Sequence, residues 1–235
     1  MRGFVLDTPA LNVYEHMAFD ELKVDKTGGD FILRFYNWAE AGVTFGYAQN
    51  CDYVMKNIPL EFKDVSVVRR PTGGGVVFHK CDLTFSCIFP SQSSLRPMEI
   101  YSKIHQAVYA GLLERKIPCK PCLEEKPSTQ YMPELNGQAA QCFVNPVKFD
   151  LVTEDGKKIL GGAVRKFKDV VLYQGSLQID DARQKQPELE TAIIKAIADK
   201  WGIAFQRENA ENNFITNVRE LAKSKYQTKQ WFEKL

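Results

Sequence analysis

The sequence has no hydrophobic run long enough to cross a membrane. A membrane-spanning helix needs about 20 consecutive apolar residues, and every apolar run in this chain is far shorter. The N-terminal segment MRGFVLDTPALNVYEHMAFDEL also lacks the basic start and continuous apolar stretch of a signal peptide. We therefore expect a cytoplasmic protein with no membrane partner.

A strong excess of one charge is also missing. The chain carries 31 Lys and Arg residues against 29 Asp and Glu residues, which gives a formal net charge of +2. Proteins that bind nucleic acids without sequence preference need many cations for phosphate contacts. The composition therefore argues against a nucleic-acid partner and favours proteins or small molecules.

Complete metal-binding and disulfide patterns are absent, although the chain has six cysteines. A reducing cytoplasm does not support a disulfide framework. Cys119 and Cys122 form a CxxC pair, but no second pair completes a zinc site, so metal or redox use is the less favoured interpretation and we expect no metal. The other cysteines are interpreted as small buried hydrophobic residues unless a neighbouring group activates them.

The pattern of apolar residues predicts one continuous domain over residues 1–235. A chain of 235 residues with 44% hydrophobic residues can bury one large core, and no repeat or linker divides it. The C-terminal helices, from about 187 to 235, are expected to belong to this domain. The predicted elements are a helix over 11–24, strands over 31–38 and 42–50, a helix over 97–115, an irregular segment over 116–138, a hairpin with Glu154-Asp155-Gly156 at its turn, a further strand up to 180, and helices over 187–201 and 208–235.

The most informative segment is VRRPTGGGVVFHKCDLTFSCIFP, residues 68–90. Three consecutive glycines lose much chain entropy on folding, so they are typical of backbone that takes unusual angles or approaches a ligand closely. With two preceding arginines and a following apolar strand, the segment suits a ligand with an acidic or carbonyl head and an apolar tail. It matches neither a phosphate-binding P-loop nor the dinucleotide fingerprint. The alternative is a glycine hairpin with two surface arginines.

A second group that could carry chemistry lies between residues 142 and 163. QCFVNPVKFDLV contains Cys142, and DGKKILGGA presents Lys158 just before two glycines. A nearby ammonium would stabilise the Cys142 thiolate, and a desolvated neutral amine could take its proton. The alternative is that Cys142 is a packed core thiol and Lys158 a solvated hairpin lysine. The sequence by itself does not bring the two together.

The chain resembles the lipoate and biotin protein ligase and acyltransferase superfamily. The resemblance runs over residues 11–180, through LNVYEHMAFDEL, FYNWAEAGVTFGYAQN, RRPTGGGVVFHKCDLTFS, GKKILGGA and YQGSLQID. It implies an α+β fold with a mixed, largely antiparallel sheet flanked by helices. It also implies that the glycine strand lines an acyl tunnel and that Lys158 faces the acyl carbonyl.

Within the superfamily the chain is most similar to the cysteine-dependent octanoyltransferases. DLTFS resembles their form of the glycine segment, and Cys142 stands eight residues before Asp150, as their nucleophile does. The polar positions typical of ATP-dependent lipoate ligases are absent, and the segment after residue 180 is shorter than a usual accessory domain. Two positions depart from the superfamily: Lys80 stands where an acidic residue is frequent, and Gln174 stands where histidine is usual.

The resemblance implies a reaction and a set of partners. We expect octanoyl transfer from a thioester on acyl carrier protein to a lysine of a lipoyl domain or glycine cleavage H protein, through a thioester on Cys142. No cofactor is required, and the protein is expected to be a monomer. The alternatives are the catalytic subunit of a lipoate ligase, which uses ATP and lipoate, and a noncatalytic protein that binds acyl groups or lipoyl domains. A biotin ligase is disfavoured because its glycine- and arginine-rich adenylate loop is missing.

The resemblance also assigns roles to individual residues. Cys142 is the expected nucleophile, and Lys158 activates it and contacts the carbonyl. His79 is interpreted mainly as a residue that fixes the glycine loop, and Arg70 either orients the substrate or forms a surface salt bridge. Lysines 223, 225, 229 and 234 could dock an acidic carrier, although a solvated helix face is the preferred interpretation. The expected substrate-binding residues are Arg70, Thr72, Gly73, Gly74, Gly75, His79, Gly161, Gly162 and Ala163.

Overall fold

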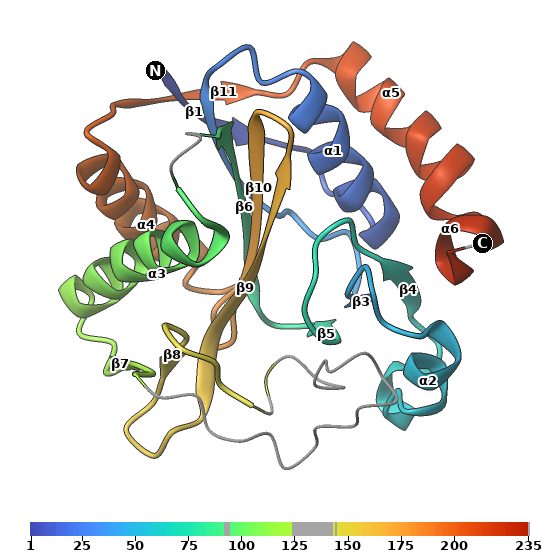
Figure 1. Ribbon diagram of the computed structural model, residues 1–235, viewed down its shortest axis with the longest axis horizontal. Helices are drawn as coiled ribbons and strands as arrows, with labels where there is room; N and C mark the ends of the chain where they lie inside the picture. Colours follow the sequence, from blue (N-terminus) through green and yellow to red (C-terminus); the bar gives the residue numbers. More distant parts are fainter. Residues whose placement is uncertain (92–94, 124–142, 144, 235) are drawn as a thin grey trace.

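An eight-stranded mixed sheet forms the centre of the computed structural model, which describes residues 1–91, 95–123, 143 and 145–234 (Figure 1). The strand order is β11-β1-β2-β6-β10-β9-β8-β7. Strand β1 runs parallel to β2 and β11, and the other pairs are antiparallel. The strands are β1 (Gly3–Asp7), β2 (Phe31–Phe35), β6 (Leu83–Pro90), β7 (Lys120–Pro121), β8 (Leu151–Val152), β9 (Lys158–Phe167), β10 (Val170–Leu177) and β11 (Phe205–Asn209).

A separate three-stranded sheet carries the glycine segment. Its order is β4-β3-β5, with β3 (Gly42–Phe45) parallel to β4 (Ser66–Arg69) and antiparallel to β5 (Val77–His79). The short helix α2 (Cys51–Lys56) and a 3₁₀ turn, Leu60–Phe62, precede β4. The three glycines therefore lie between β4 and β5. Strands β2 and β3, which are consecutive in sequence, belong to different sheets.

Helices cover both faces of the large sheet (Figure 1). Helices α3 (Pro97–Glu114) and α4 (Gln186–Trp201) pack on one face, and α1 (Val13–Asp25) and α5 (Asn212–Leu221) pack on the other. Alternation along the strands supplies both cores, because successive side chains of a strand point to opposite faces. In β2, for example, Phe31 and Leu33 join the α3 side while Ile32 joins the α1 side.

The expected fold class, an α+β domain with a mixed and largely antiparallel sheet flanked by helices, is confirmed. Helix α1 begins after Asn12, whose side chain accepts hydrogen bonds from the N–H groups of Tyr14 and Glu15, while Glu15 reaches back to the Asn12 N–H. The predicted hairpin is formed by β8 and β9, with Gly156 at φ +87° in its turn. Within the described part of the chain, no helix has both the length and the apolar character of a membrane span.

Two predicted elements need correction. The prediction of helix from Glu208 onward is wrong for its first four residues, because Phe205–Asn209 forms β11, which pairs with β1, and the next helix begins only at Asn212. Four of these five residues are exposed, so no alternation of apolar residues marks the strand. Helix α5 then leads into a π-helical turn, Ala222–Tyr226, and α6 (Lys229–Glu233). The segment predicted to be irregular contains the short strand β7 at Lys120–Pro121, and its residues 124–138 lie outside the described part.

Candidate active site

The candidate site is a narrow cavity between the two sheets. Thr44, Arg70, Val77 and His79 line it from the three-stranded sheet, Gly161, Gly162 and Ala163 from β9, Gln174, Gly175 and Ser176 from β10, and Met17, Tyr36 and Thr84 complete it. A water-sized sphere can occupy about 30 Å³ of it, enough for roughly two water molecules. The structure therefore brings together five of the predicted residues: Arg70, His79, Gly161, Gly162 and Ala163.

The glycine segment adopts a backbone that other residues would not fit. Gly74 has φ +87°, a conformation that L-residues with side chains rarely take. A Cβ atom on the facing Gly46 would lie 1.9 Å from the Gly74 carbonyl oxygen. The two backbone segments therefore touch directly, with no space for a side chain between them.

Arg70 is buried and holds the glycine segment from within. Its Nη2 donates to the carbonyl oxygens of Gly73 at 2.5 Å and Gly75 at 2.8 Å, and its Nη1 donates to Thr44 Oγ1 at 3.3 Å. The alternative of a surface salt bridge is wrong for this residue, which is 5% exposed. Arg70 shapes the loop that lines the cavity, and direct contact with substrate stays a prediction.

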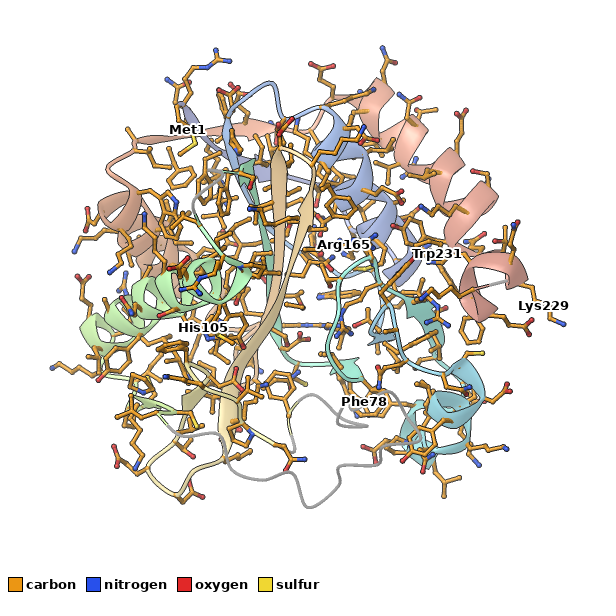
Figure 2. All side chains as sticks on the ribbon, in the orientation of Figure 1. Met1, Phe78, His105, Arg165, Lys229 and Trp231 are labelled. Carbon is orange, nitrogen blue, oxygen red and sulfur yellow. The ribbon has the colours of Figure 1, made fainter. Side chains whose placement is uncertain are left out.

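Arg69 and Arg165 connect the same segment to other elements. Arg69 donates to the carbonyls of Tyr47 and Phe232, both at 2.7 Å, and its own carbonyl accepts from Trp231 Nε1 at 2.8 Å. Arg165 of β9 donates to the Pro71 carbonyl at 2.6 Å. Figure 2 labels Arg165 and Trp231 near the junction of the two sheets. The arginine-glycine segment is thus anchored to β9 and to the C-terminal helix.

His79 links the two sheets. Its Nε2 lies 3.0 Å from Thr44 Oγ1, and its Nδ1 lies 2.8 Å from Asp82 Oδ2. Burial alone would raise the pKa of Asp82. The charge of His79 and the hydrogen bonds of His79, Thr84 and Ser176 to the carboxylate outweigh this effect and lower the pKa. Among the described contacts, the His79 ring reaches the glycine segment through Thr44, which accepts from Arg70 at 3.3 Å, so its role in fixing the glycine loop stays a prediction.

Lys158 begins β9 and forms a buried ion pair. Its Nζ lies 2.8 Å from Asp150 Oδ2, and the two side chains are 3% and 0% exposed. The interpretation of Lys158 as a solvated hairpin lysine is therefore wrong. The Val147 N–H donates to the same carboxylate at 2.7 Å, and the Tyr101 hydroxyl donates to its other oxygen. Burial raises the pKa of Asp150, and Lys158, Tyr101 and Val147 act against this shift.

Helix α3 connects this ion pair to the glycines of β9. The Tyr101 hydroxyl, besides its bond to Asp150, accepts a hydrogen bond from the Gly162 N–H at 3.3 Å. Tyr101 also stacks on His105, whose Nε2 lies 2.9 Å from the Tyr173 hydroxyl. The Gly162 N–H, at a position expected to bind substrate, already has an acceptor in this structure. It could donate to an oxyanion of the substrate only if its hydrogen bond to the Tyr101 hydroxyl were broken.

The predicted nucleophile lies outside the described part of the chain. Cys142 is therefore neither placed near Lys158 nor separated from it. Phe143, the next residue in the sequence, is described, and its ring centroid lies 5.3 Å from Lys158 Nζ. The contact is within the range of a cation–π interaction.

Gln174 occupies the position where the superfamily usually has histidine. Its Oε1 accepts from Thr72 Oγ1 at 2.6 Å, and its Nε2 donates to Asp20 at 2.8 Å and to Tyr36 at 2.9 Å. Asp20 is in turn paired with Arg34 at 2.7 Å, with both side chains fully buried. Gln174 therefore ties the glycine segment, through Thr72, to helix α1. The sequence marked the position as unusual, but nothing in it indicated this network.

The CxxC pair lies beside the Asp150 segment: the Cys122 N–H donates to the Asp150 carbonyl at 2.7 Å, and the Cys122 carbonyl accepts from the Phe149 N–H at 2.8 Å. Cys119 is a buried thiol, and Cys122 is partly exposed. Burial raises the pKa of Cys119 to about 11, which disfavours the thiolate needed for metal or redox chemistry. Within the described residues, no group of three or more metal-ligating side chains is found.

Known proteins provide an independent comparison. Two curated relatives are octanoyltransferases named LipM, from Exiguobacterium sp. (32% identical, 75% of this chain and 66% of the relative) and Staphylococcus epidermidis (30% identical, 82% and 76%). Protein Ta0514 from T. acidophilum, solved with bound lipoic acid, has a similar fold, with a TM-score of 0.77 and 22% identity over the full length of both chains. The model of the lipoyl protein ligase A/B catalytic domain matches residues 12–235. The chain therefore belongs to the lipoyl protein ligase A/B catalytic domain family.

Proposed function

We propose that this protein is an octanoyltransferase of lipoate assembly. It moves an octanoyl group from acyl carrier protein to a lysine of a lipoyl domain or glycine cleavage H protein. Its relatives named octanoyltransferase support this assignment. The observation in the structure that carries it is the buried ion pair of Lys158 and Asp150, which lies beside the glycine-lined cavity and against Phe143.

The proposed reaction has two acyl transfers. In the first, the Cys142 thiolate attacks the carbonyl carbon of the octanoyl thioester, a new carbon–sulfur bond forms, and the carrier leaves as a thiolate that takes up a proton. In the second, the neutral amine of the acceptor lysine attacks the octanoyl-enzyme thioester. An amide forms, the Cys142 thiolate is released, and the amine gives up a proton. The thioester already carries the activation, so we propose that no metal, nucleotide or other cofactor is required.

Lys158 is proposed to act on the nucleophile through its charge. An ammonium held by Asp150 favours the thiolate form of a thiol close to it. It can also stabilise the negative charge that develops on the carbonyl oxygen during each attack. Tyr101 and the Val147 N–H hold Asp150, so the ammonium is kept in one position rather than left to sample many rotamers.

The octanoyl tail is proposed to occupy the cavity between the sheets. Burial of an alkyl chain is worth about 0.8 kcal/mol per methylene, or roughly 5 kcal/mol for this tail. The cavity of about 30 Å³ is smaller than an eight-carbon chain needs. Met17 lines the cavity, and its unbranched side chain can change conformation at low cost. We propose that Met17 moves when the acyl chain enters.

Incubation of the full-length protein with octanoyl acyl carrier protein tests this function. Intact mass spectrometry should show the addition of one octanoyl group, which Cys142→Ser prevents or converts to a slowly reacting ester. Addition of a lipoyl domain should then release the group as an amide on the acceptor. Transfer that requires ATP and free lipoate and survives the change at Cys142 would identify a lipoate ligase instead. The names of the relatives support that alternative less. Absence of transfer from any donor would leave the noncatalytic binding protein.

A further inference from the structure

A second and larger groove lies on the outer side of helix α3. Its volume is about 630 Å³, and it is formed by α3, by the turn before β8 and by the end of α4. We call it the α3 groove. Its four cations and two large apolar side chains are Arg96, Lys103, Lys148, Lys200, Met98 and Phe149.

The charges of the α3 groove are unbalanced. Among the described residues that line it, the one acidic residue is Glu99, which is paired with Arg96 at 3.6 Å. In the part of the chain that is described, no carboxylate forms an ion pair with Lys103, Lys148 or Lys200. Lys103 instead lies over the Trp201 ring at 4.4 Å, and Lys200 donates to Gln106 at 3.0 Å. Burial and the charge of Lys200 both lower the pKa of Lys103, as expected for cations that lack an anion between them.

The floor of the α3 groove is held in an unusual conformation next to the catalytic ion pair. Phe149 has φ +74°, a region that residues other than glycine rarely adopt. Its N–H donates to the Cys122 carbonyl at 2.8 Å, and its carbonyl oxygen lies 2.9 Å from His105 Nδ1. The next residue is Asp150, which holds Lys158. His105 is labelled on α3 in Figure 2. A ligand in the groove is therefore one residue away from the proposed catalytic apparatus.

We propose that the α3 groove docks the acyl carrier protein that donates the octanoyl group. This inference rests on the proposed function. The donor carries its thioester at the far end of a phosphodiester-linked arm, so its phosphate lies between the carrier surface and the entrance to the active site. The acceptor instead presents a lysine cation, which the groove would repel. Unpaired cations around Met98 and Phe149 thus fit an acidic, partly apolar carrier surface and its phosphate better than they fit the acceptor.

The test reverses two exposed charges of the groove in the full-length protein, Lys148→Glu with Lys200→Glu. The matched control, Lys56→Glu with Lys63→Glu, makes the same change in net charge at two exposed lysines elsewhere. The value of kcat/KM is measured with octanoyl acyl carrier protein and with octanoyl-pantetheine, which has neither protein nor phosphate. We expect the ratio of the two values to fall about tenfold for the groove variant and less than twofold for the control. Rising salt should lower the ratio for the unaltered protein and change it less for the groove variant.

Two outcomes would overturn the docking site. The first is an unchanged ratio in the groove variant while the unaltered protein transfers octanoate normally, a result that leaves the proposed function intact. The second is a rise in KM for the lipoyl-domain acceptor alone, which would assign the groove to the acceptor. Binding of octanoyl acyl carrier protein, measured by fluorescence anisotropy, tests the groove without turnover. If the unaltered protein binds the carrier tightly and the groove variant does not, the site stands even where transfer fails.

Discussion

Replacement of Asp150 by asparagine should destabilise the protein through the charge it leaves behind. The change keeps the size of the side chain and removes the carboxylate that lies 2.8 Å from Lys158 Nζ. Because the Lys158 side chain is 3% exposed, water cannot replace the lost partner. Breaking a buried ion pair in this way costs about 3–5 kcal/mol.

An upper limit on this loss follows from the ordinary pKa of lysine. A buried ammonium that has lost its carboxylate partner can release its proton, which costs about 1.4 kcal/mol per pH unit below about 10.4, or nearly 5 kcal/mol at pH 7. Once the folded variant contains neutral Lys158, its unfolded state binds one more proton than its folded state. The stability of the variant should therefore rise with pH, by up to about 1.4 kcal/mol per unit between pH 7 and 10.

Urea unfolding at pH 7, 8 and 9 measures these values, with Asp180→Asn as a control at an exposed carboxylate. We expect a loss of 3–5 kcal/mol at pH 7 for Asp150→Asn, a smaller loss at pH 9, and less than about 0.5 kcal/mol for the control. Octanoyl transfer should fall at least tenfold at pH 7, because the cation is lost or displaced. A loss below about 1 kcal/mol that does not change with pH would refute the buried ion pair as the anchor of Lys158.

Three further outcomes are expected. Gly46→Ala should destabilise the protein by about 1–3 kcal/mol in thermal unfolding and reduce transfer, because its methyl group would meet the Gly74 carbonyl oxygen. The methyl group added by Gly73→Ala would meet no atom within 4 Å, so this change should alter stability by less than about 1 kcal/mol. A drop in transfer without a drop in melting temperature would show that a ligand approaches this backbone. The pKa of Asp82 is lowered in the folded state, so its contribution to stability is present above about pH 4 and is lost as pH falls through the folded pKa. His79→Gln should reduce this acid-dependent loss of stability in urea titrations between pH 7 and 3. An unchanged pH profile would contradict the pairing of His79 with Asp82.

The secondary structure that depends on local periodicity could be predicted from the sequence. The helices α1, α3 and α4 and the hairpin of β8 and β9 follow from amphipathic spacing, capping residues and turn residues. Strand β11 could not be predicted, because its residues are mostly polar and its structure comes from pairing with β1. The separation of β2 and β3 into two sheets is likewise a tertiary property.

In the candidate site, too, some features could be predicted from local sequence and others depend on contacts between distant residues. Asp150 and Lys158 stand on either side of the predicted hairpin turn, but the register places Lys158 opposite Val152 and contains a bulge, so the turn residues alone do not indicate the ion pair. The contacts of Gln174 with Thr72 and Asp20 join residues 102 and 154 positions apart. No local pattern carries that information. The sequence could therefore mark the glycine segment and the lysine as important, but it could not show what holds them.

Helix α3 provides a physical reason for the two sites to lie together. Tyr101 and Lys103 are two positions apart, which places them about 200° apart around the helix axis. Tyr101 faces inward and holds Asp150, whereas Lys103 lies in the α3 groove. One rigid helix thus fixes both the proposed carrier-docking surface and the ion pair of Lys158. An exchange of charge on its outer face should change how the donor binds, and loss of the Tyr101 hydroxyl should change the chemical step once the donor is bound.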